Sequence, residues 1–196
     1  MSAWLQPVGA VLAGGAGRRI GGDKAIVELE GRPLLLYPLA VLRAVLAEVA
    51  IVAKRDTALP ALEAHTGIWV EPDHPRHPLS GIVHALRLAA GRSVLVVAAD
   101  MPLVDVPLVR ALIDAERAAG GAAAVLPRAG GRLQPLCALY TQRALPTLER
   151  FDPDARAADA AAALDPVVLD VADETAFFNV NAPEDLLQAA ALLSRT

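Results

Sequence analysis

Residues 93–99 read SVLVVAA, a run with no polar side chain after its first residue. A strand that is apolar on both faces is typical of the centre of a parallel sheet, because helices cover both faces of such a sheet. Aromatic residues make up only 4% of the chain, which disfavours a sandwich packed around large rings. This run therefore favours an α/β fold over an all-β one.

Strand-like and helix-like segments alternate along most of the chain. Strands are predicted at 8–12, 48–53, 68–70, 93–99, 122–126, 134–140 and 167–171. Helices are predicted from Pro33 onward through LLLYPLAVLRAVLAEV, and at 61–65, 81–90, 107–119, 143–150, 154–164 and 183–193, with Asn181 or Ala182 capping the last. The proline-rich segment 71–80 is predicted to be irregular. This order predicts a three-layer α/β/α, Rossmann-like fold with a mostly parallel mixed sheet and a ligand site at the carboxyl ends of the strands.

Length and charge restrict the classes of function. The 196 residues, 55% of them hydrophobic, suffice for one substantial core, so residues 1–196 are expected to form a single domain. The net charge of −4 argues against a general nucleic-acid binder, which needs many lysines and arginines on phosphates. A small anionic ligand remains compatible with this charge.

Cysteine content and the first residues favour a cytoplasmic protein without a membrane segment. Cys137 is the only cysteine, so the chain has no internal disulfide and no paired cysteines for zinc. The first apolar run lacks a preceding basic segment and is broken by glycines well short of the ~20 residues that cross a bilayer.

The segment LAGGAGRRIGGDK at 12–24 follows the first predicted strand and indicates a phosphate-binding loop. Its five glycines allow backbone N–H groups to approach an anion, and Arg18, Arg19 and Lys24 add positive charge. The P-loop motif does not fit, because Lys24 is followed by alanine rather than serine or threonine. The dinucleotide fingerprint does not fit either, because Ile20 stands where a third glycine is required.

Asp100 ends the central predicted strand, at the sheet edge where the glycine-rich loop is expected. Mg²⁺ needs only one or two protein carboxylates when substrate phosphates and waters complete its shell, so Asp100 is a candidate metal ligand. A turn or helix-cap role is the alternative for an isolated aspartate, and the loop before it favours the metal.

Two other catalytic arrangements have weaker support. Asp73, His74, His77 and His84 could form a zinc site, but an irregular proline-rich loop does not favour tetrahedral geometry. Ser80 lacks the surrounding motif of a nucleophilic serine, which disfavours a Ser-His-Asp triad.

Five motifs occur in an order that resembles a known family. They are LAGGAGRRIGGDKAIVELEGRPLL, PLSGI, AADMPLV, QPLCALY and FFNVNAPEDLL. The match covers nearly the whole chain, from Val11 to Leu187. Together they are similar to the molybdenum cofactor guanylyltransferases, the MobA-type branch of the NTP-transferase superfamily, which has the nucleotide-diphospho-sugar transferase fold. The first motif alone is shared with sugar-nucleotide pyrophosphorylases, whereas the combination with Asn-x-Asn-x-Pro-Glu-Asp is more specific.

The resemblance implies roles for individual residues. Leu12, Ala13, Gly14 and Gly15 would contact the nucleotide, and Lys24 and Arg18 would lie against its phosphates. Asp100 would bind Mg²⁺, Asp73 would help to hold the nucleotide, and Asn179 and Asn181 would lie near the pterin or the metal. Pro78 and Leu79, with the glycines of the first loop, would favour guanine.

The implied reaction is transfer of GMP from GTP to the terminal phosphate of molybdopterin, with release of pyrophosphate. GTP and molybdopterin would be the substrates, and proteins that insert molybdenum or mature molybdoenzymes would be partners. His77 replaces the usual glycine before Pro-Leu, and Lys54 stands in a segment without the expected asparagine, so base recognition departs from the family. The alternatives are a cytidylyl or sugar-1-phosphate transferase and a noncatalytic nucleotide-binding regulator.

Overall fold

The computed structural model describes residues 5–14, 24–152 and 154–194, and a mixed sheet forms its central layer. Within this part of the chain the sheet order is β10-β7-β9-β6-β1-β4-β5, and β8 pairs with β7. The strands are β1 (Val8–Leu12), β4 (Val49–Ala53), β5 (Gly67–Val70), β6 (Val94–Ala98), β7 (Ala124–Ala129), β8 (Arg132–Leu133), β9 (Cys137–Tyr140) and β10 (Val167–Asp170). The neighbours of β1 are parallel to it, whereas β9 runs antiparallel to β6 and β7. The predicted mostly parallel mixed sheet is therefore confirmed.

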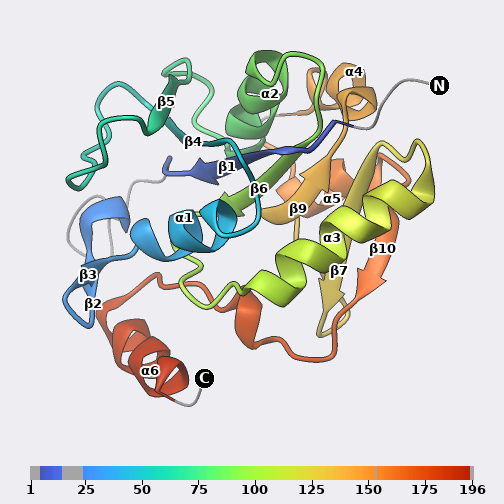
Figure 1. Ribbon diagram of the computed structural model, residues 1–196. Helices are drawn as coiled ribbons and strands as arrows, with labels where there is room; N and C mark the ends of the chain where they lie inside the picture. Colours follow the sequence, from blue (N-terminus) through green and yellow to red (C-terminus); the bar gives the residue numbers. More distant parts are fainter. Residues whose placement is uncertain (1–4, 15–23, 153, 195–196) are drawn as a thin grey trace.

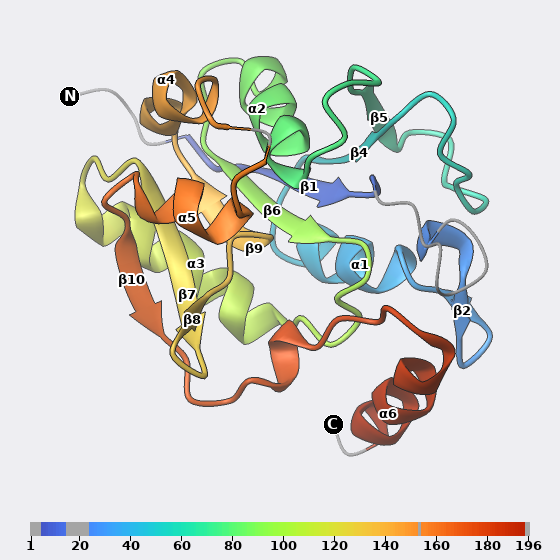
Figure 2. The same cartoon turned by 180° about the vertical axis from the view of Figure 1, so that it is seen from behind.

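Helices cover both faces of this sheet (Figures 1 and 2). One face carries α1 (Leu36–Arg43) and α3 (Val106–Ala119), and the other carries α2 (Pro78–Leu88), α4 (Leu145–Leu148) and α5 (Ala157–Ala162). The central strands β1 and β6 are buried along their whole length, as the apolar run at 93–99 predicts. The three-layer architecture follows from burying both faces of these two strands.

A small third cluster joins the last helix to the beginning of the first crossover. Helix α6 (Pro183–Leu193) packs beside the hairpin of β2 (Glu28–Leu29) and β3 (Arg32–Pro33), away from the main sheet (Figure 2). Leu29, Leu34, Val180 and Ala189 form the buried centre of this contact. The end of the described chain is thereby placed close to the segment that contains Lys24.

The first predicted helix begins later than expected, because the hairpin precedes it. Pro33 lies in β3, and the backbone N–H of Leu34 donates to the carbonyl of Val27. Glu30 and Gly31 form the turn of the hairpin, both with positive φ. Strands of two residues give no alternating pattern to detect, which is why the sequence analysis missed them.

Two other predictions need correction. Residues 61–65 form no helix but a turn, since five residues cannot support an isolated helix and the side chain of Arg43 binds Glu63 and Thr66 instead. Helix α2 begins at Pro78, inside the segment predicted to be irregular. Proline suits a first helical position because it has no N–H to leave unpaired, and His77 Nδ1 accepts the hydrogen bond of Leu79 N at 3.2 Å.

The remaining helices agree with the predictions in position, although their ends shift. The segment at 143–150 contains a 3-10 turn followed by α4, and that at 154–164 is shortened to α5. No helix in the described residues combines the length and apolar character needed to cross a membrane.

Candidate active site

The carboxyl ends of β6, β1 and β4 open into a cavity of about 450 Å³. These strands are parallel neighbours, so the residues after them meet at one edge of the sheet. Lys24 and Asp100 line one end of the cavity, Lys54 and Glu71 line the other, and Leu12 is among the apolar residues of the wall. The predicted location of the ligand site thus coincides with an actual cavity.

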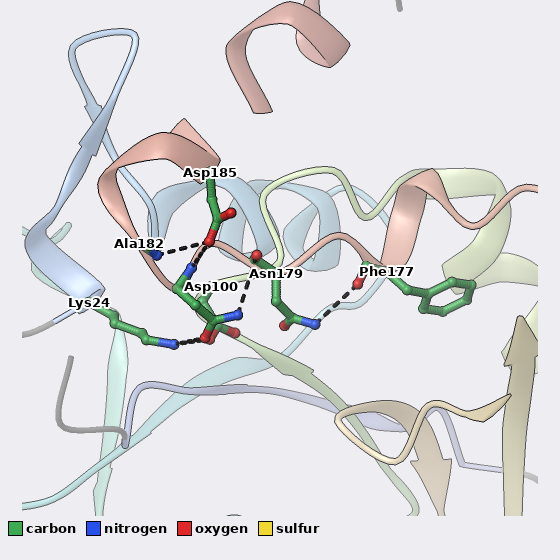
Figure 3. Close-up of polar contacts among 7 residues, drawn as sticks. Lys24, Asp100, Phe177, Asn179, Ala182 and Asp185 are labelled. Carbon is green, nitrogen blue, oxygen red and sulfur yellow. Dashed lines mark hydrogen bonds and ion pairs between the residues drawn. The ribbon is translucent and has the colours of Figure 1, made fainter. Parts of the chain in front are cut away.

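Lys24 and Asp100 form an ion pair at the first end. Lys24 begins the 3-10 helix Lys24–Ile26, and Asp100 follows β6 by two residues. The Lys24 Nζ atom lies 2.8 Å from Asp100 Oδ2, and each side chain is 18% exposed (Figure 3). Lys24 and Asp100 therefore lie side by side at the cavity, and their roles in phosphate and metal binding stay predictions.

Asn181 joins this pair from the distant C-terminal segment. Its Oδ1 atom accepts a hydrogen bond from Lys24 Nζ at 2.5 Å, and the neighbouring Val180 N–H donates to the Asp100 carbonyl at 2.9 Å. The Asn181 side chain therefore belongs to the polar cluster at Lys24.

The side chain of Asp185, rather than that of Asn181, accepts backbone hydrogen bonds at the amino end of α6. Its Oδ2 atom accepts from the backbone N–H of Asn181 at 2.8 Å and of Ala182 at 2.9 Å (Figure 3). Ala182 occupies the cap position, and its methyl group cannot accept a hydrogen bond. The capping alternative for the Asn181 side chain is therefore wrong, and Asp185 also fixes the backbone from which that side chain reaches Lys24.

Asn179 lies on the same segment but makes a different contact. Its Nδ2 atom donates to the Phe177 carbonyl at 3.1 Å, and Asn181 Nδ2 donates to the Asn179 carbonyl at 3.5 Å. Neither Asn179 nor Asn181 is among the described residues that line the cavity, although Asn181 contacts Lys24, which does. An acceptor-binding role for either asparagine stays a prediction.

The other predicted site residues are only partly brought together. Leu12, Ala13, Gly14 and Pro78 line the cavity. Leu79, in the first turn of α2, is fully buried in the core, and Asp73 is exposed and does not line the cavity. Gly15 and Arg18 lie outside the described residues.

Lys54 and Glu71 are buried cavity residues to which the sequence analysis gave no binding role. They follow β4 and β5, and their side chains are only 8% and 5% exposed. Lys54 Nζ lies 3.4 Å from Glu71 Oε1 and donates to the Pro72 carbonyl at 2.7 Å. Only composition could have drawn attention to Lys54, because it is one of only two lysines in the chain.

Burial dominates the electrostatics of this second end. Desolvation raises the pKa of Glu71 above its ordinary value, although the charge and hydrogen bond of Lys54 act in the opposite direction. Desolvation also lowers the pKa of His84, with smaller effects from the positive charges of Arg87 and Lys54. Glu71 Oε2 and His84 Nε2 are both buried without a hydrogen-bond partner among the described residues.

Two glycines make room for the Glu71 carboxylate. A Cβ atom at Gly14 would lie 2.8 Å from Glu71 Oε1, and one at Gly81 would lie 3.6 Å from Glu71 Oε2. The first distance is a steric clash, so a larger residue at position 14 would have to displace the Glu71 carboxylate from its place beside Lys54.

The described residues do not form a zinc site. No group of three or more histidine, cysteine, aspartate or glutamate side chains in this part of the chain could hold a metal. His77 Nε2 contacts the carbonyl of Ala155 at 3.1 Å while its Nδ1 caps α2. Cys137 is buried, which raises the pKa of its thiol to about 12 and makes it a poor thiolate ligand.

Comparison with known proteins assigns the family. The model of the MobA-like NTP transferase domain matches residues 9–167 of this chain. The chain belongs to the MobA-like NTP transferases. A molybdenum cofactor guanylyltransferase of Cereibacter sphaeroides is 40% identical over 194 residues, which cover 95% of this chain and 97% of that protein.

Solved structures agree with this assignment. Molybdopterin-guanine dinucleotide biosynthesis protein A from Archaeoglobus fulgidus matches with a TM-score of 0.75 and 25% identity, covering 96% of this MobA-like chain and 100% of the other. A Mycobacterium tuberculosis protein solved as a complex with manganese shares the fold, with a TM-score of 0.69 at 19% identity and coverage of 95% and 99%. The MobA-like chain is thus a nucleotidyltransferase by family and by fold.

The cap of α6 gives a direct test of the local geometry in this MobA-like chain. We expect Asp185→Ala to lower the free energy of unfolding by about 1 kcal/mol, because two backbone N–H groups lose their acceptor. Asn181→Ala should change it by less than about 0.5 kcal/mol, since its side chain does not cap the helix. Urea denaturation measures both changes.

Glu184→Ala is the matched control, because this exposed carboxylate lies in the same first turn. Equal losses for Asp185→Ala and Glu184→Ala would show that only the charge near the helix end matters, and would contradict the assigned cap.

Proposed function

We propose that this chain transfers GMP from GTP to the terminal phosphate of molybdenum-loaded molybdopterin and releases pyrophosphate. The observation that carries the proposal is the likeness to a molybdenum cofactor guanylyltransferase along 95% of the chain. This likeness favours the guanylyltransferase over the cytidylyl and sugar-1-phosphate alternatives. The ion pair at the cavity edge supports a catalytic role over that of a nucleotide-binding regulator.

The proposed reaction needs no nucleophile from the protein. An oxygen of the molybdopterin phosphate attacks the α-phosphorus of GTP, the bond from that phosphorus to the β-phosphate oxygen breaks, and pyrophosphate leaves with those electrons. Such a transfer depends on in-line positioning and on stabilising charge as it develops. Lys24 supplies a compact positive charge at the cavity edge for this purpose.

Asp100 is the residue that would hold a divalent cation, which we propose to be Mg²⁺. Its carboxylate is partly exposed at the cavity, and one carboxylate with substrate phosphates and waters satisfies the preference of Mg²⁺ for oxygen. When bound, the cation would neutralise phosphate charge. Lys24 holds the Asp100 side chain at the cavity edge through their ion pair.

The first loop would bind the nucleotide mainly through its backbone. Leu12, Ala13 and Gly14 lead from β1 into the cavity wall between β6 and β4, and Gly14 lies against the Glu71 carboxylate. We retain the proposed contacts of Gly15 and Arg18 with the phosphates. Asp73 is exposed and outside the cavity wall, so its proposed nucleotide contact would require the ligand to extend beyond the cavity.

The acceptor would approach from the side of the C-terminal segment. Asn181 contacts Lys24 there, and an amide can both donate to and accept from a pterin edge without adding charge beside a phosphate. Proteins that supply molybdopterin, insert molybdenum or receive the finished cofactor remain proposed partners.

Lys24→Ala tests the main catalytic assignment. We expect the variant to fold normally and to lose on the order of 10² to 10³ in kcat, because one preorganised charge contact is removed. Pyrophosphate release from GTP with molybdopterin measures this rate. Arg132→Ala is the control for removal of an exposed cation far from the cavity; wild-type turnover in Lys24→Ala would exclude the assigned role.

Asp100→Asn tests metal binding. The amide retains the shape of the side chain but lacks the negative charge that a hard cation prefers, so the Mg²⁺ concentration for half-maximal activity should rise at least about tenfold. Asp105→Asn is the control, because asparagine caps α3 as well as aspartate does while the same charge is lost nearby. An unchanged dependence of activity on Mg²⁺ concentration in Asp100→Asn would show that the metal is not bound by Asp100.

Asn181→Ala tests the acceptor side. We expect the KM for molybdopterin to rise about tenfold and the KM for GTP to change much less, because the lost amide faces the proposed acceptor. Steady-state kinetics with each substrate varied in turn measures both constants. A rise confined to the KM for GTP would contradict the acceptor assignment and leave Asn181 as a partner of Lys24 alone.

A further inference from the structure

The charged pair at the second end of the cavity has no role in the chemistry described so far. Lys54 and Glu71 are the buried charged or polar residues of the described core, and both line the cavity. Removing an ammonium and a carboxylate from water costs several kcal/mol per ion unless their mutual contacts compensate. The pair is therefore a costly feature at a ligand cavity, where a packed apolar pair would give comparable stability.

The geometry fixes Lys54 rather than Glu71 as the group that faces a ligand. Glu71 Oε2 is buried and has no partner in the described part of the chain, while Oε1 lies against Gly14 and beside Lys54. The Lys54 ammonium has three donors, and its described contacts with Pro72 and Glu71 engage two. Glu71 and Pro72 therefore hold the ammonium in place and leave a donor for the cavity.

The sheet sets the distance between the two ends. Asp100 follows β6 and Lys54 follows β4, and β1 lies between these strands. Two strand spacings place the two ends roughly 10 Å apart. If the phosphates of a nucleotide lie at Lys24 and Asp100, the base lies toward Lys54.

The walls near Lys54 suit a flat base. Leu12, Val52, Pro78 and Gly81 line this part of the cavity with apolar atoms, and the missing side chain of Gly81 widens it. The polar groups of a base would then be recognised by charged residues of the lining. Lys54 and Glu71 are buried there, whereas Asp56 and Arg76, which also line the cavity, are exposed and pair with each other.

We propose that Lys54 is a specificity-determining residue that donates a hydrogen bond to O6 of guanine, and that Glu71 is the positioning residue that holds it. Guanine presents two acceptors, O6 and N7, on the edge that lysine recognises. Adenine presents an amino group in place of O6, and its N–H donors cannot pair with an ammonium. The inference rests on the proposed use of GTP and names the residue that selects it.

The test is direct binding of GTP, ITP and ATP by calorimetry with Mg²⁺ and without acceptor. The inosine base keeps O6 and N7 but lacks the 2-amino group, so the wild type should bind ITP within about threefold of GTP and bind ATP on the order of 10²-fold more weakly. Lys54→Met should weaken GTP and ITP equally, by about 10- to 100-fold, and should abolish the preference over ATP. Wild-type discrimination against ITP as strong as that against ATP would overturn the proposal, since the 2-amino group would then be the feature recognised.

Three further variants separate recognition from misfolding. Lys54→Met/Glu71→Gln removes both charges, so no unpaired buried ion remains, and it should show the same loss of preference. Arg55→Met removes an exposed cation one residue further on and should keep the preference. Glu71→Gln should reduce the preference for GTP over ATP and leave the affinities for GTP and ITP equal to each other. If the folded double variant kept the preference for GTP over ATP, the role of Lys54 would be overturned.

This binding assay distinguishes the inference from the proposed function. Absence of transfer to molybdopterin in a separate turnover assay would reject the guanylyltransferase activity, whereas the base preference is measured without any acceptor. Equal affinity of the wild type for all three nucleotides would reject base selection by Lys54 whatever the acceptor proves to be.

Discussion

The ammonium group of Lys24 connects three segments that are far apart in the chain. It belongs to the first crossover, it pairs with Asp100 at the end of the central strand, and it binds Asn181 before the last helix. The sheet alone would place only the first two near each other, since α6 packs away from it. The polar contact at Lys24 and the small apolar cluster around Leu29 together determine how the C-terminal segment meets the cavity.

The sequence predicted those parts of the fold that follow from local patterns. The buried strand at 93–99 and the alternation of elements are properties of consecutive residues, and they led to the correct sheet type and the correct edge for the site. Asp100 could be predicted because it ends that strand, and Lys24 because it follows the glycine-rich loop. The β2–β3 hairpin escaped prediction because its stability comes from Leu34 and α6 rather than from its own two-residue strands.

The second end of the cavity shows why the rest could not be predicted. Lys54 and Glu71 are 17 positions apart, and neither has a motif around it that indicates ligand binding. Their contact depends on the parallel register of β4 and β5, which places Ala53 opposite Val70. The sequence offered Asn181 or Ala182 as the cap of α6, and Ala182 occupies that position, but nothing local indicated that the Asp185 side chain accepts the hydrogen bonds there.

The contact between Lys24 and Asn181 also constrains the order of events during synthesis. The two residues are 157 positions apart, so every strand of the central sheet emerges from the ribosome before Asn181 does. A nascent chain can begin to assemble its sheet while translation continues. The polar cluster at Lys24, by contrast, can be completed only after the segment before α6 has been released from the exit tunnel. A ribosome-bound chain would therefore contain the scaffold of this enzyme before it contained the complete polar cluster at Lys24.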